Sequence, residues 1–185
     1  MSDFQTIADR VEIEALRGEF TDAAMMRDYD RLASLFTPDG ALRMPNIPVE
    51  WVGQQQIRGW GDRVEEFVDF LVQNVHPGTI TLDGDTASGR AYMSEIGRIR
   101  DGRQGVNYAI YHDRYQRTGH GWKFTERVYE VRYEDNTPLT GSPPPPGRDG
   151  SIMTCAAVRR SRRGDRAPTG RTAPRAGRSA VRRCR

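Results

Sequence analysis

Apolar residues recur at helical spacing in two long stretches of the chain. In residues 3–27 they alternate with acids and arginines, as on a helix that buries one face; they are Ile7, Val11, Leu16, Phe20, Ala23 and Ala24. Residues 54–73 carry a second stripe, made of Ile57, Trp60, Val64, Phe67, Val68 and Leu71. A shorter helix over residues 31–36 is expected between them, because Asp28 stands where an N-cap residue is preferred. The first half of the chain therefore predicts three helices.

The pattern then changes to strands separated by tight turns. Two short strands are expected at residues 41–44 and 50–52, and four longer strands at 78–82, 86–100, 106–117 and 122–133. Turn residues such as Asp83-Gly84-Asp85 separate the long strands, which is typical of an antiparallel meander. This order predicts an α+β fold: a cone in which three N-terminal helices pack on a curved, mixed or antiparallel sheet and enclose a pocket.

The net charge of +3 hides two oppositely charged parts. Residues 151–185 contain eleven arginines and a single acid, Asp165, so the first 150 residues carry a net charge of −7. We therefore expect a folded domain over residues 1–136, a proline-rich linker over 137–150 and a disordered arginine-rich tail over 151–185.

The tail has two readings. Its excess of positive charge suits salt-dependent contact with phosphates, but it has no interleaved aromatic residues. Its composition also suits an out-of-frame read of GC-rich coding sequence with no selected function. We favour the second reading and do not expect a nucleic-acid partner.

Both cysteines, Cys155 and Cys184, lie in the tail, so the domain has no disulfide and no cysteine metal site. The N-terminus lacks an apolar signal sequence, and no long apolar run predicts a membrane span. We expect a cytoplasmic protein.

His76 is one of three histidines and precedes the first long strand, in the stretch NVHPGTITLDGDTA. An imidazole titrates near neutral pH, so it is a candidate for proton transfer at the mouth of a pocket. The alternative is that His76 caps a helix end or packs in the core. From the residue alone we favour the second, structural reading.

An ordered set of local sequences resembles the SnoaL-like branch of the NTF2-like superfamily. The set runs from DYDRLASLF at residues 28–36, through Pro38-Asp39-Gly40, Gln54 and His76, to LDGDTA at residues 82–87 and GWKF at residues 121–124. The resemblance implies an α+β cone with a deep pocket, and a homodimer or homotrimer. The superfamily includes dehydratases, isomerases, cyclases, epoxide hydrolases, a dehydrochlorinase and proteins without catalysis, so the fold alone does not define the reaction.

Within that branch the chain is most similar to the dehydrochlorinase and dehydratase-like group. Those enzymes use an Asp–His pair and an arginine on the last long strand. The resemblance implies Asp28, His76 and Arg127 as the catalytic set, with Asp28 orienting His76 as a base and Arg127 stabilising a developing anion. Strict alternation places Arg127 opposite Trp122 and Phe124, so we predict a β-bulge that returns it to the pocket face.

Five further residues are candidates for substrate binding: Tyr29, Trp60, Asn107, Tyr108 and His112. Asn107 and Tyr108 lie on opposite faces of one strand, and the sequence does not tell which face lines the pocket. His112 has a structural or interface role as its alternative.

The function that we predict is a cofactor-independent lyase or isomerase, acting by β-elimination, dehydration or a proton shift on a small hydrophobic metabolite. No residues have metal-ligand spacing and no nucleotide-binding motif is present, so we expect neither a metal nor a cofactor. Two alternatives remain: a non-catalytic ligand-binding or assembly module of this fold, and an epoxide hydrolase or cyclase.

Overall fold

The fold is described from a computed structural model for residues 3–47 and 49–142. The tail of residues 151–185 and most of the proline-rich linker lie outside the described residues, so the predictions about them stay predictions. Within the described part, α1 (Asp3–Met25), α2 (Tyr29–Ser34) and α3 (Gln54–Phe67) are the helices. The strands are β1 (Phe36–Met44), β2 (Val49–Val52), β3 (Val68–Asp83), β4 (Thr86–Ile99), β5 (Gln104–Thr118) and β6 (Gly121–Asp135).

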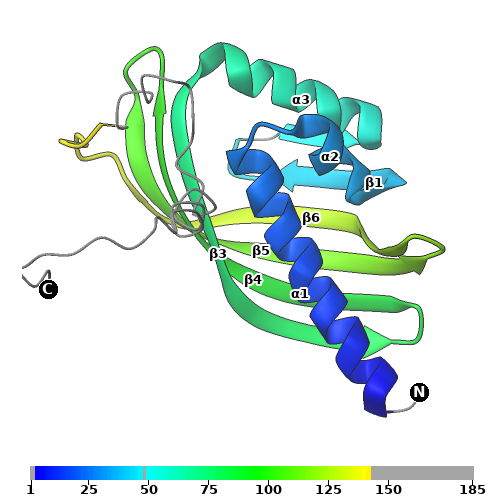
Figure 1. Ribbon diagram of the computed structural model, residues 1–185. Coiled ribbons are helices and arrows are strands. Elements are labelled where there is room, and N and C mark those ends of the chain that lie inside the picture. The colour runs from blue at the N-terminus through cyan, green and yellow to red at the C-terminus, as the bar shows by residue number, and fades with distance from the viewer. Residues whose placement is uncertain (1–2, 48, 143–185) are drawn as a thin grey trace, which may run out of the picture. The chain divides into compact units, whose positions relative to one another are not determined.

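The strands form one sheet in the order β2-β1-β6-β5-β4-β3. β1 and β6 pair in parallel and the other neighbours pair antiparallel, so β3 to β6 make the predicted meander. The sheet is not closed. Helix α1 crosses over the long strands, while α3 lies beside β1 and β2 (Figure 1). The predicted α+β fold, with three helices on a mixed sheet, is confirmed.

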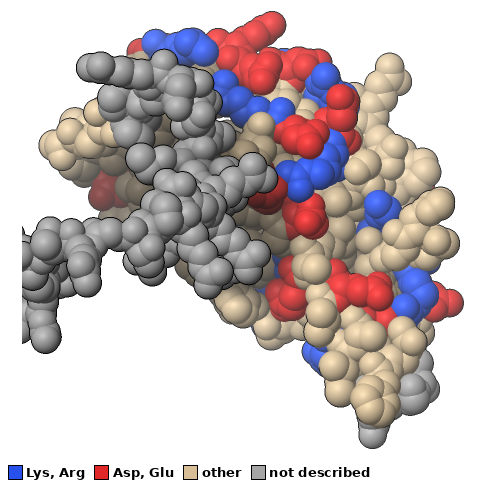
Figure 2. Space-filling model, in the orientation of Figure 1, with Lys and Arg blue, Asp and Glu red and all other residues tan. Residues whose placement is uncertain are grey.

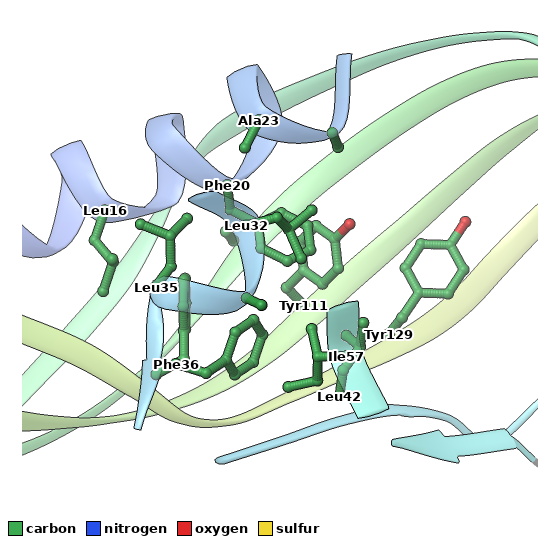
Figure 3. Packing of buried hydrophobic residues seen from close by; sticks show 14 of the residues in the cluster. Leu16, Phe20, Ala23, Leu32, Leu35, Phe36, Leu42, Ile57, Tyr111 and Tyr129 are labelled. Atoms are coloured by element: carbon green, nitrogen blue, oxygen red, sulfur yellow. The ribbon is translucent and has the colours of Figure 1, made fainter. Parts of the chain in front are cut away.

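The core forms where α1 and α2 face the sheet. Phe20 of α1 meets the rings of Phe36, Tyr111 and Phe124 edge-on, with ring centroids 5.9 to 6.1 Å apart. Leu32 and Ile57, from the other two helices, are completely buried beside this group (Figure 3). Burial of these aromatic and branched side chains holds the helices against one face of the sheet.

The structure corrects the end of the third predicted helix. Helix α3 ends at Phe67 instead of residue 73, and β3 begins at Val68, which is already extended. The residues that follow, Val-Asp-Phe-Leu-Val, are rich in β-branched and aromatic side chains, and pairing with β4 favours the strand over the helix. As a result Gln73 lies on a strand, where its side chain is buried.

A smaller correction concerns the second helix and the turn after it. Helix α2 runs from Tyr29 to Ser34 instead of over residues 31–36, and Pro38-Asp39-Gly40, a sequence typical of turns, is part of β1. The register between β1 and β6 shifts between Phe36 and Ala41, so the turn-forming residues occupy an irregular stretch of a strand.

The helical face carries intermixed acidic and basic side chains (Figure 2). Arg31 pairs with Glu19 at 2.7 Å and also with Asp22, which joins α2 to α1. Arg58 likewise joins α3 to α2 by pairing with Asp30, and it also pairs with Asp62 within α3. Among the described residues, no helix is long and apolar enough to cross a membrane.

Two glycines of α3 give a matched test of how tightly α2 and α3 pack. A methyl group on Gly61 would lie 2.1 Å from Cγ of Tyr29, whereas nothing lies within 4 Å of the same position on Gly59. We expect Gly61→Ala to lower the free energy of unfolding by about 1–3 kcal/mol through overpacking. Gly59→Ala should raise it by about 0.5–1 kcal/mol, because alanine favours the helix. Urea denaturation of both variants measures the difference; equal stabilities would contradict the packing of Tyr29 on Gly61.

Candidate active site

A cavity of about 480 Å³ lies between the helices and the inner face of the sheet. A wider depression shares Val68, Leu71, Glu95 and Asn107 with it and opens from it toward the outside. Most of the side chains that line the cavity are apolar or aromatic. They are Phe20, Ala24, Leu42, Met44, Ile47, Trp60, Val64, Phe67, Val68, Leu71, Tyr111, Tyr129 and Val131, with the polar Asn46, Gln73, Glu95, Asn107 and Glu134.

Three of the polar residues form a row across neighbouring strands. Gln73 on β3 is the register partner of Glu95 on β4, and Glu95 is in turn the partner of Asn107 on β5. Directly paired residues on adjacent strands have neighbouring side chains. The pairing therefore brings an amide, a carboxyl group and a second amide together in the cavity.

Hydrogen bonds connect this row to the tyrosines. Nε2 of Gln73 donates to Oε2 of Glu95 at 3.0 Å and to the hydroxyl of Tyr111 at 3.2 Å. The ring of Tyr129 packs 5.6 Å from that of Tyr111, and both hydroxyl groups point away from the apolar cluster (Figure 3). Oε1 of Gln73 is buried without a hydrogen-bond partner among the described residues, whereas the side chain of Asn107 lies within hydrogen-bonding reach of the Tyr129 hydroxyl.

The surroundings of Glu95 raise the pKa of its carboxyl group above the usual 4.5. Loss of solvent around the carboxyl group is the main cause, and the hydrogen bonds from Gln73 and Asn107 oppose it in part. Burial disfavours a carboxylate because the charged form loses hydration. Desolvation also raises the pKa of Tyr111 and of Tyr129, so both phenols are neutral donors near neutral pH.

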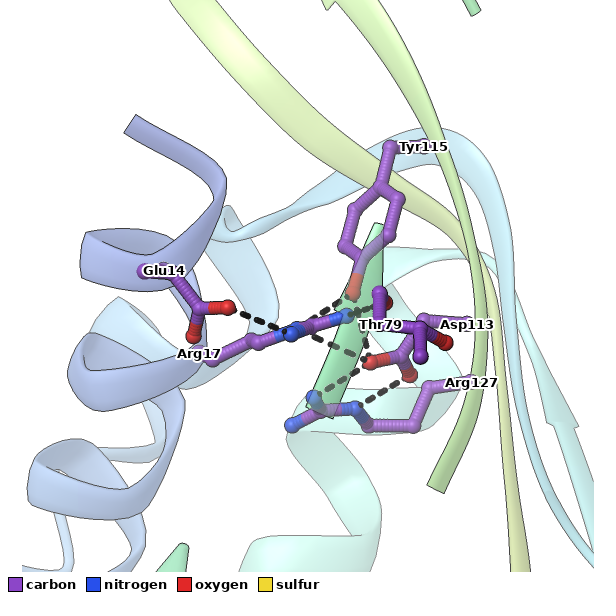
Figure 4. A network of polar contacts seen from close by, with 6 residues as sticks. All are labelled: Glu14, Arg17, Thr79, Asp113, Tyr115 and Arg127. Carbon is purple, nitrogen blue, oxygen red and sulfur yellow. Dashed lines mark hydrogen bonds and ion pairs between the residues drawn. The ribbon is translucent and has the colours of Figure 1, made fainter. Parts of the chain in front are cut away.

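Beneath the cavity lies a buried ionic network (Figure 4). Arg127, which is fully buried, donates from Nε and Nη2 to the two carboxylate oxygens of Asp113, each at 2.8 Å. The guanidinium group is enclosed by the rings of Tyr111, Phe124 and Phe20, with centroids 4.0, 4.1 and 4.4 Å away. The bidentate pair and the ring contacts fix Arg127 against the back of Tyr111.

A second arginine approaches the same carboxylate from α1. Arg17 donates from Nε to the hydroxyl of Tyr115 at 2.8 Å, and that hydroxyl donates to Asp113 at 2.7 Å. The remaining nitrogens of Arg17 reach the Thr79 carbonyl and Glu14, each at 2.9 Å. Asp113 thus interacts with two buried guanidinium groups and ties α1 to the sheet.

The predicted β-bulge that turns Arg127 inward is confirmed. Tyr115 pairs with Phe124 and Arg114 pairs with Glu126, so Thr125 is an extra residue on β6. The shift places Arg127 on the inner face, as the prediction requires. The structure gives Arg127 a carboxylate partner in Asp113; its predicted catalytic role stays a prediction.

The structure does not bring Asp28 and His76 together. Asp28 caps α2: its carboxylate accepts from the backbone N–H of Arg31 at 3.1 Å and pairs with the Arg31 side chain. His76 is exposed on the outer face of β3, with Nε2 3.3 Å from Oγ of Ser94. The bulge in β3 follows His76, between it and Thr79, so His76 keeps the parity of the outward residues.

The five predicted binding residues divide between the cavity and other places. Trp60 and Asn107 line the cavity. Tyr29 is buried in the core against Trp60, with ring centroids 6.3 Å apart. Tyr108 is 53% exposed on the other face of β5, and Nε2 of His112 lies on that face, 2.6 Å from Glu130. Tyr29, Tyr108 and His112 line neither the cavity nor its opening.

Sequence reasoning missed Gln73 and Glu95. Gln73 was hidden because its stretch also fits a helix. Glu95 carries a usable signal, since it continues the alternate positions Ala87, Ala91 and Met93, all of which are buried. An acid on the apolar face of a strand indicates a polar group that faces the interior.

Across residues 3–47 and 49–142, no three His, Cys, Asp or Glu side chains come together in a way that could hold a metal ion. The polar groups that line the cavity are Glu95, Glu134, the amides of Asn46, Gln73 and Asn107, and the hydroxyls of Tyr111 and Tyr129.

Comparison with known proteins agrees with this architecture. An uncharacterized protein of Mycobacterium tuberculosis, Rv2910c, is 28% identical over 124 residues, which cover 66% of this chain and 84% of that protein. Among solved structures, LinA is 22% identical with a TM-score of 0.71, over 78% of this chain and all of LinA. The hexachlorocyclohexane dehydrochlorinase LinA-type3 from Novosphingobium barchaimii is 21% identical with a TM-score of 0.69, over 77% of this chain and all of that protein. At these identities the two structures show the fold alone.

The model of the SnoaL-like domain matches residues 5–128, which include α1 through the first half of β6. This span contains Gln73, Glu95, Asn107 and Tyr111. The chain belongs to the SnoaL-like domain family.

Proposed function

We propose that this protein is a cofactor-independent lyase or isomerase that moves a proton on a small hydrophobic substrate, with Glu95 as the proton-transferring group. The observation that supports this most is a carboxyl group of raised pKa on the wall of a largely apolar cavity. A base in such surroundings is stronger than an exposed carboxylate, because it lacks stabilising water. A perturbed carboxyl group in a cavity is a recognised indicator of a functional site.

The neighbouring groups suit the same reaction. As a carboxylate, Glu95 would remove a proton from a substrate carbon, and the electrons of that C–H bond would form a double bond. In an elimination the leaving group then departs with its bonding electrons; in an isomerisation Glu95 returns the proton to another carbon. The hydroxyl of Tyr111, 3.2 Å from Nε2 of Gln73, would donate a hydrogen bond to a developing oxyanion.

This proposal replaces Asp28 and His76 as acid–base groups, since their side chains have other partners on other surfaces. Arg127 would act from behind Tyr111, 4.0 Å from its ring centroid, as a positioning residue. LinA-type3 is named as a dehydrochlorinase, an enzyme that removes hydrogen and chloride from its substrate, so an elimination of this kind is compatible with the fold. The homo-oligomeric state and the cytoplasmic location expected from the sequence stay predictions.

The test is deuterium exchange into 2-tetralone, a bicyclic ketone that is small for the cavity and carries acidic C–H bonds. Mass spectrometry follows the uptake of deuterium by 2-tetralone in D₂O. We expect the wild-type protein to make this uptake faster than it is in buffer alone. Glu95→Gln should lower the rate enhancement over buffer by at least about 100-fold, which is the contribution that a general base usually makes.

Glu134→Gln is the matched control, because Glu134 lines the same cavity but is exposed. It should retain most of the exchange rate. No acceleration by the wild-type protein, or equal rates for wild type and Glu95→Gln, would contradict the role of Glu95. Binding of 2-tetralone without exchange would instead favour the non-catalytic ligand-binding alternative.

A further inference from the structure

The orientation of the Gln73 amide leaves an unpaired acceptor at the cavity. Nε2 donates to Oε2 of Glu95 at 3.0 Å. The reversed amide would place Oε1 against the carboxylate, and two acceptors would then face each other. With the amide held in this way, Oε1 is buried and has no partner among the described residues. A ligand that supplies an O–H or N–H donor would satisfy it.

The charge of the lining restricts the ligand further. Glu95 and Glu134 both line the cavity, and no lysine or arginine does so among the described residues. The arginines at the wider opening have acidic partners: Arg98 lies 4.0 Å from Asp69, and Arg103 pairs with Asp101 at 2.9 Å. Two carboxylates on the lining, with the nearby arginines paired to acidic residues, disfavour a carboxylate or phosphate on the ligand.

The shape of the lining indicates the rest of the molecule. Trp60, Tyr111, Tyr129, Phe20 and Phe67 supply aromatic surface on several sides of the cavity. Such walls bind a ring system through apolar burial and ring contacts. The hydroxyl of Tyr129, which also lines the cavity, offers a second polar contact.

We infer that the substrate is an uncharged cyclic compound bearing a hydroxyl group, and that this hydroxyl donates a hydrogen bond to Oε1 of Gln73. Anionic analogues should bind weakly. The inference rests on the proposed function only in using the same cavity. Gln73 is a specificity-determining residue in this scheme, and Glu95 performs the chemistry.

The test compares three probes of one skeleton, 2-naphthol, 2-methoxynaphthalene and 2-naphthoate, by isothermal titration of the full-length protein. We expect 2-naphthol to bind about 10-fold more tightly than its methyl ether, which cannot donate a hydrogen bond. We expect 2-naphthoate to bind at least about 10-fold more weakly than 2-naphthol, since its charge repels Glu95 and Glu134.

The variant Gln73→Met keeps a long side chain and removes the acceptor. It also removes the Nε2 donor to Glu95 and Tyr111. It should reduce the preference for 2-naphthol over the methyl ether to about one, because the amide acceptor is gone. Asn74→Met, the next residue along β3 and exposed, is the control and should keep the wild-type preference.

Equal binding of 2-naphthol and its ether, tighter binding of 2-naphthoate, or an unchanged preference in Gln73→Met would each overturn the inference. Because the titration measures binding only, these outcomes are independent of deuterium exchange. A protein that exchanges 2-tetralone but shows no preference for the hydroxyl group keeps the proposed function and loses the substrate class.

Discussion

Asp113→Asn is expected to lower the free energy of unfolding by about 3–5 kcal/mol, the usual cost of removing one partner from a buried ion pair. The Asp113 side chain is completely buried and binds Arg127 through two hydrogen bonds of 2.8 Å. Without its charge, Arg127 and the equally buried Arg17 would face each other with no carboxylate between them. An uncompensated buried charge is costly because the protein interior cannot replace hydration.

Urea denaturation followed by tryptophan fluorescence measures this effect. The control is Asp85→Asn, because Asp85 also pairs with an arginine, Arg117, but is 82% exposed. An exposed ion pair contributes little, so this variant should unfold close to wild type. Equal midpoints for Asp113→Asn and wild type would contradict the network under the cavity.

The second large effect concerns the pH dependence of stability through Glu95. Its pKa is raised in the folded protein, chiefly by desolvation. The folded state therefore binds the Glu95 proton more tightly than the unfolded state does. The resulting stability is fully present below the unfolded pKa near 4.5 and is lost as pH rises through the folded pKa.

Above the folded pKa, the ionised Glu95 is buried at a cost that lowers the stability of the wild-type protein. Glu95→Gln removes this cost, so the variant should match wild type in acid and exceed it in stability above the folded pKa of Glu95. The same variant loses deuterium exchange. A gain in stability with a loss of activity is the pattern expected at a site built for function. Thermal unfolding of both proteins across the pH range measures the difference; a constant difference at every pH would contradict the raised pKa.

Much of the fold could be predicted from residue patterns because local and tertiary preferences agree. The turn at Asp83-Gly84-Asp85 has one good structural solution. The stripe predicted for α1 is right only from Leu16 onward: Ile7 and Val11 are 59% and 62% exposed, whereas Ile13 is completely buried. The end of α3 could not be predicted, since Val68 and Leu71 satisfy both helical and strand periodicity. Pairing with β4, a contact distant in sequence, decides that boundary.

The candidate site was predicted in part for the same reason. Trp122 and Phe124 face the core, and strict alternation along β6 would then turn Arg127 outward. A bulge between Phe124 and Arg127 was therefore needed to bring Arg127 inward, and it is present. The outward position of His76 depends on a second bulge, which follows it in β3. A bulge displaced by a few residues exchanges the two faces of a strand, and the local sequence around His76 does not determine its place.

The most direct test of Glu95 as the proton-transferring group is its own titration. Carbon-13 NMR of the glutamate side-chain carboxyl groups, with Glu95→Gln to assign the signal, reports its pKa in the folded protein. We predict a midpoint clearly above the usual value of 4.5. A midpoint at or below that value would mean that the carboxyl group is well solvated or stabilised as an anion, and it would contradict the proposed site.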